Sequence, residues 1–194
     1  MKKIILASKS PRRSELMSSF AIPFEIIPSQ YDEDLKGKKF TYELINDVSK
    51  NKAFSVAEKL DFDAIVVGAD TVVVLEDEIL LKPEDEQDAY NELRKLSGRT
   101  HLVVTSITVV DTATMRYETE ATTSEVTFQN LTDKQIWKYI KTKKPLDKAG
   151  AYGIQELDKS FVKFLNGSKN NVIGLSTSSL KNLLLKIDKS LSLY

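Results

Sequence analysis

The stretch AIVVGADTVVVLEDEILLKP, from Ala64 to Pro83, decides the fold that we expect for this chain. It begins with the apolar, β-branched run Ala64 to Val67, which predicts a strand buried on both faces of an α/β sheet. Gly68 is expected to end that strand. Asp70 and Thr71 would then follow its carboxyl end, which is where open α/β sheets gather their ligands.

A β-hairpin is predicted for the rest of this stretch. The apolar run Val72 to Leu75 turns through two acidic residues into Ile79 to Leu81, which returns Lys82 to a place near Asp70. A carboxylate and a lysine that are separate in the sequence would then be close in space. In the alternative interpretation, Asp70 only caps a turn and Lys82 is solvated.

The composition excludes several classes of protein. The 194 residues contain 28 Lys and Arg against 28 Asp and Glu, so a net charge of zero offers no global field for nucleic acid or for an anionic membrane. The absence of cysteine excludes disulfides and thiol nucleophiles and suits a reducing cytosol. The single histidine, His101, rules out a His-rich metal site and favours a structural role. The amino terminus is too poor in apolar residues for a signal peptide or a membrane span, so we expect a cytoplasmic protein.

Two arginines at the start of a helix indicate an anion site. Lys3 to Ala7 is predicted to be a buried strand, and Ser10-Pro11 is typical of a helix N-cap and first helical residue. Arg12 and Arg13 then lie where the helix dipole is already positive and where carboxylates are usually found. A phosphate would offset this cost, and Ser8 would add a hydroxyl donor. Alternatively the segment is a solvated basic turn, and the P-loop pattern is absent.

The next segment combines carboxylates with a lysine. Asp32, Glu33 and Asp34 lie in a polar loop and could hold a hard divalent cation, although such runs are usually only solvated. A helix is predicted from Thr41 to about Leu60, and Lys52 interrupts its apolar stripe. Lys52 either snorkels along the helix or turns towards a phosphate. The residues of this segment alone favour snorkelling.

The remaining pattern predicts further elements around the sheet. They are a helix near Ala89 to Leu96, paired strands at His101 to Val110 and Arg116 to Phe128, a helix with a capping box from Thr132, strands at Phe161 to Leu165 and Val172 to Leu175, and a terminal helix from about Ser178.

The segment LDKAGAYGIQ, which ends at Gln155, is the second stretch rich in chemically active side chains. Asp147 and Lys148 supply two opposite charges, and Gly150 and Gly153 permit close approach of the backbone. This mixture is typical of a binding loop. The alternative is a glycine-rich connector.

Several motifs together resemble the Maf family of nucleoside triphosphate pyrophosphatases, first named as septum-formation proteins. They are LASKSPRRSEL (Leu6 to Leu16), Asp32-Glu33, Asn51-Lys52-Ala53, GADTVV (Gly68 to Val73), Leu81-Lys82-Pro83, LSGRTH (Leu96 to His101) and DKAGAYGIQ (Asp147 to Gln155). In this order they cover nearly the whole chain. The chain departs from the family near its end, where the usual GSYxNVVGLP is GSKNNVIGLS, from Gly167 to Ser176.

The resemblance implies an α/β fold with a mixed twisted sheet and flanking helices. Residues 1–194 would form a single Maf-like domain of two lobes around a central cleft, similar to the inosine-triphosphatase architecture. It also implies cleavage of a nucleoside triphosphate between its α and β phosphates, with a divalent cation, Mg²⁺ or Mn²⁺, as cofactor. Asp70 would be the general base. The implied phosphate ligands are Arg13, Lys52 and Lys82, Ser8 is a further substrate-binding residue, and the implied metal ligands are Glu33 and Asp70.

Arg12, Thr71 and Gln155 together resemble the branch that acts on dTTP and UTP. The amide of Gln155 matches uracil or, when flipped, cytosine, whereas Arg12 has only donors and requires a carbonyl. The hydroxyl of Thr71 can donate or accept and would only tune the choice. The alternatives are a nucleotide-binding regulator of cell division without turnover and an inosine-triphosphate-type pyrophosphatase. A homodimer is expected as one form, although the sequence does not fix the oligomeric state.

Overall fold

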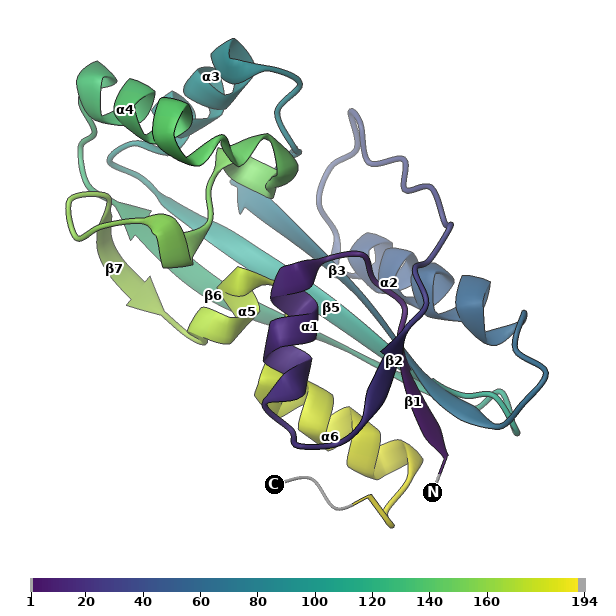
Figure 1. Cartoon of the computed structure of the whole chain (residues 1–194). Helices are drawn as coiled ribbons and strands as arrows, with labels where there is room; N and C mark the ends of the chain where they lie inside the picture. Colours follow the sequence, from purple (N-terminus) through teal and green to yellow (C-terminus); the bar gives the residue numbers. More distant parts are fainter. Residues whose placement is uncertain (1, 192–194) are drawn as a thin grey trace.

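A seven-stranded mixed sheet forms the centre of the computed structural model, which describes residues 2–191 (Figure 1). The strand order is β2-β1-β3-β5-β6-β7, and β4 pairs with β3 off this path. β1 runs parallel to β2 and β3, and the other pairs are antiparallel. The expected mixed α/β fold is confirmed. The strands are β1 (Lys3–Leu6), β2 (Phe24–Ile26), β3 (Ala64–Leu75), β4 (Glu78–Leu80), β5 (Thr100–Asp111), β6 (Tyr117–Phe128) and β7 (Val162–Asn166).

Helices cover both faces of this sheet. α1, α5 and α6 lie on one face and α2 on the other, while α3 and α4 lie side by side at one end (Figure 1). Three short 3₁₀ turns join α4 to β7. The helical elements are α1 (Pro11–Ser18), α2 (Tyr42–Ala57), α3 (Glu86–Leu96), α4 (Asp133–Lys143), η1 (Pro145–Asp147), η2 (Ala149–Ala151), η3 (Ile154–Glu156), α5 (Lys169–Ile173) and α6 (Thr177–Ile187).

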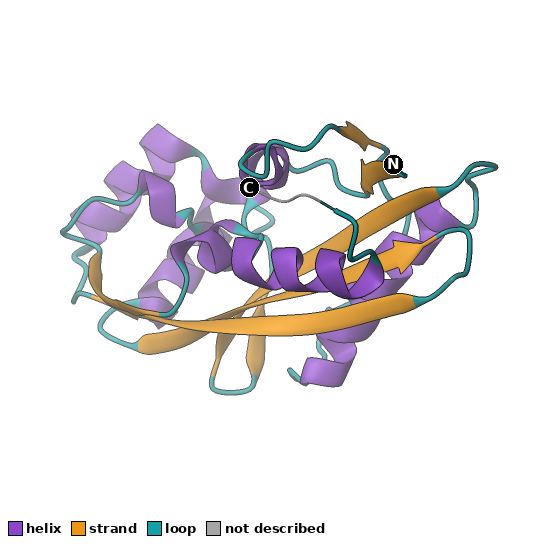
Figure 2. Ribbon diagram, turned by 90° about the horizontal axis from the view of Figure 1, so that it is seen from below, coloured by secondary structure: helices purple, strands orange, loops and turns teal. Residues whose placement is uncertain are grey.

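The alternation of side chains along β3 explains these layers. Successive residues of a strand point to opposite faces of the sheet. Ile65 and Val67 pack on the buried leucines of α6, whereas Ala64 and Val66 pack with Ala53 of α2. β3 is therefore buried on both faces, and Figure 2 shows α6 lying along one of them.

The expectation that Gly68 ends the strand is wrong. β3 continues to residue 75, so Asp70 and Thr71 lie in its middle and not at its carboxyl end. The glycine serves a different purpose. A Cβ at this position would lie 2.5 Å from the backbone nitrogen of Ala53 and 2.6 Å from the carbonyl oxygen of Ser49. Gly68 therefore lets α2 approach β3 closely.

A break in strand pairing along one edge of β3 leaves room for a site. β1 pairs with residues 64–67 of β3, and β4 pairs with residues 73–75. Within the described part of the chain, residues 68–72 have no strand partner on that edge, although β5 covers the other edge continuously. Asp70 and Thr71 point to opposite faces of the sheet, and both reach the opening at this break.

The segment after β7 also differs from the expectation. Residues 169–173 form α5, so the strand predicted at Val172 to Leu175 is wrong. Ser168 caps this helix by accepting a hydrogen bond from the backbone nitrogen of Asn171. The capping box at Thr132 and the hairpin of β5 and β6 are confirmed. Within residues 2–191, no helix has both the length and the apolarity required to cross a membrane.

Candidate active site

A cavity of ≈ 460 Å³ opens at the break in strand pairing. Its volume is in the range of small-molecule sites. Residues from eight separate parts of the chain line it, and the nine candidate substrate-binding, catalytic and metal-binding residues are among them. Those residues are Ser8, Arg12, Arg13, Glu33, Lys52, Asp70, Thr71, Lys82 and Gln155.

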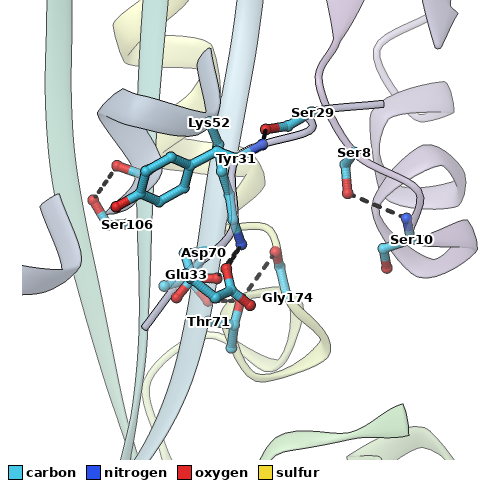
Figure 3. A network of polar contacts seen from close by, with 12 residues as sticks. Ser8, Ser10, Ser29, Tyr31, Glu33, Lys52, Asp70, Thr71, Ser106 and Gly174 are labelled. Atoms are coloured by element: carbon cyan, nitrogen blue, oxygen red, sulfur yellow. Dashed lines mark hydrogen bonds and ion pairs between the residues drawn. The ribbon is translucent and has the colours of Figure 1, made fainter. Parts of the chain in front are cut away.

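Lys52 lies between two carboxylates inside this cavity. Its Nζ donates to Oδ1 of Asp70 over 2.6 Å and forms an ion pair with Glu33 (Figure 3). Only 13% of the Lys52 side chain is exposed, so the snorkelling interpretation is wrong. The close packing of α2 on β3 at Gly68 turns this lysine towards the strand.

Asp70 has one oxygen engaged and one free. Oδ2 of Asp70 is buried and has no hydrogen-bond partner among the described residues. Burial raises the pKa of the Asp70 carboxyl; the charge of Lys52 opposes this effect and that of Glu33 adds to it. A carboxylate with a raised pKa and an unused oxygen can accept a proton from water.

Arg13 makes hydrogen bonds only to neutral acceptors among the described residues. Nε donates to the carbonyl oxygen of Gly174 at 2.9 Å, Nη2 donates to Oγ1 of Thr71 at 3.0 Å, and Nη1 approaches Oγ of Ser8 at 3.4 Å. Burial lowers the pKa of the guanidinium, but an arginine remains protonated at neutral pH. Its orientation is thus fixed by these contacts while its charge stays available to an anion.

Lys82 supplies a second such charge. It follows β4, is exposed, and lines the cavity. Within the described part of the chain, no carboxylate forms an ion pair with Lys82 or Arg13. Unpaired cations in a cavity favour a polyanionic ligand because they meet no competing carboxylate.

Arg12 is held differently, by a chain of charged groups. Its Nη1 donates to Oδ2 of Asp147 at 2.8 Å, and Nζ of Lys148 donates to Oδ1 of Asp147 at 2.8 Å. Lys148 also pairs with Glu156 at 3.3 Å. Although its burial acts in the opposite direction, these bonds from Lys148 and Arg12 lower the pKa of Asp147 to about 2. These ion pairs link α1 to the segment 145–156.

A hard divalent cation fits the oxygen donors of the site. The carboxylates of Asp70 and Glu33 both belong to residues that line the cavity. The described residues contain no cluster of three or more His, Cys, Asp or Glu side chains suited to a metal. Mg²⁺ is commonly bound by one or two carboxylates and completed by phosphate oxygens and water. The donor set therefore suits a cation that is bound together with a phosphate ligand.

The sequence pattern places Lys148 in a binding loop without a specific role, and it favours only a structural role for His101. Lys148 is buried, lines the cavity and lies against Gly153, whose missing Cβ leaves room for the lysine stem. Its place next to Asp147 in a glycine-rich loop was the available signal. His101 Nε2 lies 2.7 Å from Oη of Tyr152, and burial lowers the pKa of His101 to about 3. His101 is therefore neutral and supports Tyr152, which lines the cavity.

Known proteins resemble this chain in sequence and in fold. A protein from Clostridium beijerinckii named dTTP/UTP pyrophosphatase is 44% identical over 188 residues, which cover 95% of this chain and 99% of that protein. A protein of the same name from Thermoanaerobacter sp. (strain X514) is 44% identical, with 94% and 95% covered. The solved structure of a HAM1 protein from Coxiella burnetii shares the fold with a TM-score of 0.53 at 15% identity, covering 96% of this chain and 100% of that one.

The family model described as Maf-like protein matches residues 3–187, which span every element of the sheet and every residue of the cavity. Together with the relatives above 40% identity, this match agrees with the resemblance found in the motifs. The chain belongs to the Maf family.

Proposed function

We propose that this protein hydrolyses dTTP and UTP to the nucleoside monophosphate and pyrophosphate. The observation that carries the proposal is the free, buried Oδ2 of Asp70 beside the cations of one cavity. The names of the Clostridium and Thermoanaerobacter relatives support the choice of substrates. A triphosphate needs both a base for water and cations for its charge.

In this mechanism Asp70 is the general base. Oδ2 accepts a proton from water, the water oxygen forms a bond to the α phosphorus, and the bond from that phosphorus to the bridging oxygen breaks, so that pyrophosphate leaves. The hydrogen bond from Lys52 holds the carboxylate in one orientation. Arg13 and Lys82, which lack carboxylate partners among the described residues, contact the phosphates, and Ser8 adds a hydroxyl.

We further propose that Glu33 and Asp70 hold a divalent cation, Mg²⁺ or Mn²⁺. The carboxylates of Glu33 and Asp70 both line the cavity, which supports this assignment. Such a cation would neutralise phosphate charge and polarise a phosphoryl oxygen. Calorimetric titration of Mg²⁺ with the wild type and with Glu33→Gln, in the presence of UMP, tests it without turnover. Equal affinity in both proteins would remove Glu33 from the site.

We propose that Arg12, Thr71 and Gln155, which line the same cavity, select the base of the nucleotide. Arg12 can donate to a carbonyl of uracil or thymine and cannot accept from the amino group of cytosine. A buried mismatch of this kind costs about 1–3 kcal/mol. We therefore expect UTP and dTTP to be preferred over CTP.

Hydrolysis in H₂¹⁸O tests the cleavage position. Attack at the α phosphorus places the label in dTMP, whereas attack at the β phosphorus places it in pyrophosphate. Release of dTDP and orthophosphate as first products would contradict the proposal. Binding of dTTP without any turnover would favour the alternative of a regulatory nucleotide-binding protein, and faster hydrolysis of ITP than of dTTP would favour an inosine-triphosphate-type enzyme.

The homodimer, the cytoplasmic location, and the absence of nucleic-acid and membrane partners stay predictions. Light scattering of the purified chain with and without dTTP would measure the oligomeric state. A monomer under both conditions would contradict the homodimer.

A further inference from the structure

A buried threonine lies directly behind Thr71. Thr105 of β5 is opposite Thr71 in the antiparallel register, so both side chains point to the same face of the sheet. Their hydroxyl oxygens are 2.9 Å apart. Thr105 is completely buried and does not line the cavity, whereas Thr71 does.

The neighbours of Thr105 fix the direction of its proton. Oγ1 of Thr105 lies 2.9 Å from the carbonyl oxygen of Asn171, and a carbonyl oxygen can only accept. The single proton of Thr105 is therefore used on Asn171. The amide of Asn171 is itself held in place because Nδ2 donates to the carbonyl oxygen of Val103 at 2.9 Å and to Oγ of Ser124 at 3.0 Å.

The direction of the proton of Thr71 follows from this arrangement. Since the proton of Thr105 is already used, Thr71 must donate in the bond that joins the two hydroxyls. The carbonyl oxygen of Gly174 is farther away, at 3.4 Å from Oγ1 of Thr71, and already accepts from Nε of Arg13 at 2.9 Å, so Thr105 is the stronger acceptor for the proton of Thr71. Arg13 donates to Oγ1 of Thr71 from a third direction. Thr71 thus has no proton left for a ligand and offers only a lone pair.

We propose that Thr105 is a positioning residue that makes Thr71 an acceptor and thereby contributes to the choice of the base. This inference rests on the proposed function, in which Thr71 faces the base. N3 of uracil and thymine carries a hydrogen and is a donor, whereas N3 of cytosine is an acceptor. A hydroxyl that can only accept forms a hydrogen bond with N3 of uracil or thymine, but it faces another acceptor at N3 of cytosine. Without Thr105, the hydroxyl of Thr71 can turn and donate to cytosine.

The test compares kcat/KM for UTP and CTP in matched variants. Thr105→Val keeps the shape but removes the hydroxyl, and Thr105→Ser keeps the hydroxyl. The control is Thr108→Val, a buried threonine of the same strand whose hydroxyl bonds to Ser49 and Thr119 on the α2 side. We expect Thr105→Val to lower the UTP-to-CTP ratio about five- to thirtyfold, the effect of removing a buried mismatch. Thr105→Ser and Thr108→Val should stay within about twofold of the wild-type ratio, well below the change expected for a lost hydrogen bond.

Several outcomes would overturn the inference. An unchanged ratio in folded Thr105→Val, or an equal fall in Thr108→Val, would give Thr105 a merely structural role. If Thr105→Val does not fold, Thr105→Cys replaces it, because a thiol is a weak donor and acceptor. Failure of the proposed function is distinguishable, since the wild type would then hydrolyse neither nucleotide. If the wild type is active and Thr71→Val leaves the UTP-to-CTP ratio of kcat/KM unchanged, Thr71 does not contact the nucleotide base.

Discussion

Arg12 of α1 donates a 2.8 Å hydrogen bond to Asp147, which lies 135 residues later in the chain. Lys148 donates to the other oxygen of the same carboxylate. The bond therefore fixes a cation of the helix start against the segment that carries Gln155. Arg12 and Gln155, two of the three side chains proposed to read the nucleotide base, belong to the elements that this ion pair joins.

Replacing Asp147 by Asn is expected to lower kcat/KM for UTP about three- to tenfold, because a charge-assisted bond that orients Arg12 is weakened. In an Arg12→Ala background the same replacement should add less than about twofold if Asp147 acts only through Arg12. The matched control is Asp158→Asn, an exposed aspartate whose side chain bonds only to Ser160 among the described residues. Kinetics of the four proteins of this cycle measure the coupling, and additive effects would contradict it.

Asp70→Asn is expected to keep the fold and to lose about 10²- to 10⁴-fold in kcat, because an amide cannot accept the proton of water. The Asn carbonyl can still accept from Lys52, so the melting temperature should change little. Single-turnover hydrolysis of dTTP and thermal unfolding measure the two effects. Near-normal turnover would place the base elsewhere, with Glu33 as the next candidate.

Local sequence signals predicted most of the fold. The hairpin of β5 and β6 followed from two β-rich runs around a turn, and α4 from the capping box at Thr132. Because these signals depend on neighbours in the chain, they need no knowledge of tertiary contacts. Motifs identified the nine candidate site residues, and the structure places all nine on one cavity.

The errors share a different physical origin. Gly68 was read as a strand end, although the reason for a glycine is the backbone of α2, which is far away in the sequence. The residues around Lys52 taken alone favour snorkelling, because its two carboxylate partners come from other segments. The apolar run Val172 to Leu175 favours a strand, whereas the contacts of Asn171 with β5 and β6 that hold α5 in place are tertiary. Thr105 carried no local signal at all.

Gly68→Ala is expected to destabilise the protein by about 1–3 kcal/mol, because the added Cβ would overlap the backbone of α2. A shift of α2 would also move Lys52 away from Asp70, so kcat should fall. Gly37→Ala is the control: a Cβ at this position meets nothing within 4 Å, but its positive φ costs about 1 kcal/mol. Urea unfolding measures the stability of the two variants, and steady-state kinetics measure their kcat. A normal kcat in a destabilised Gly68→Ala would show that the distance between α2 and β3 does not control the activity of Asp70.

Glu92 is a buried carboxylate on α3, and its Oε2 has no hydrogen-bond partner among the described residues. Burial raises the pKa of Glu92 from 4.5 to about 8, and the nearby Asp88 adds to this effect. The folded state then binds a proton more tightly than the unfolded state. Stability is therefore complete below the unfolded pKa and falls as pH rises from about 4.5 towards 8, by up to ~1.4 kcal/mol per pH unit.

Glu92→Gln removes this titration, so its free energy of unfolding should exceed that of the wild type at pH 8 and match it near pH 4.5. The exposed Glu58→Gln on the C-cap of α2 serves as the control and should follow the wild-type curve. Urea unfolding at half-unit pH steps measures all three proteins. The assignment fails if the wild type and Glu92→Gln lose stability in parallel across this range, because the loss would then come from other groups.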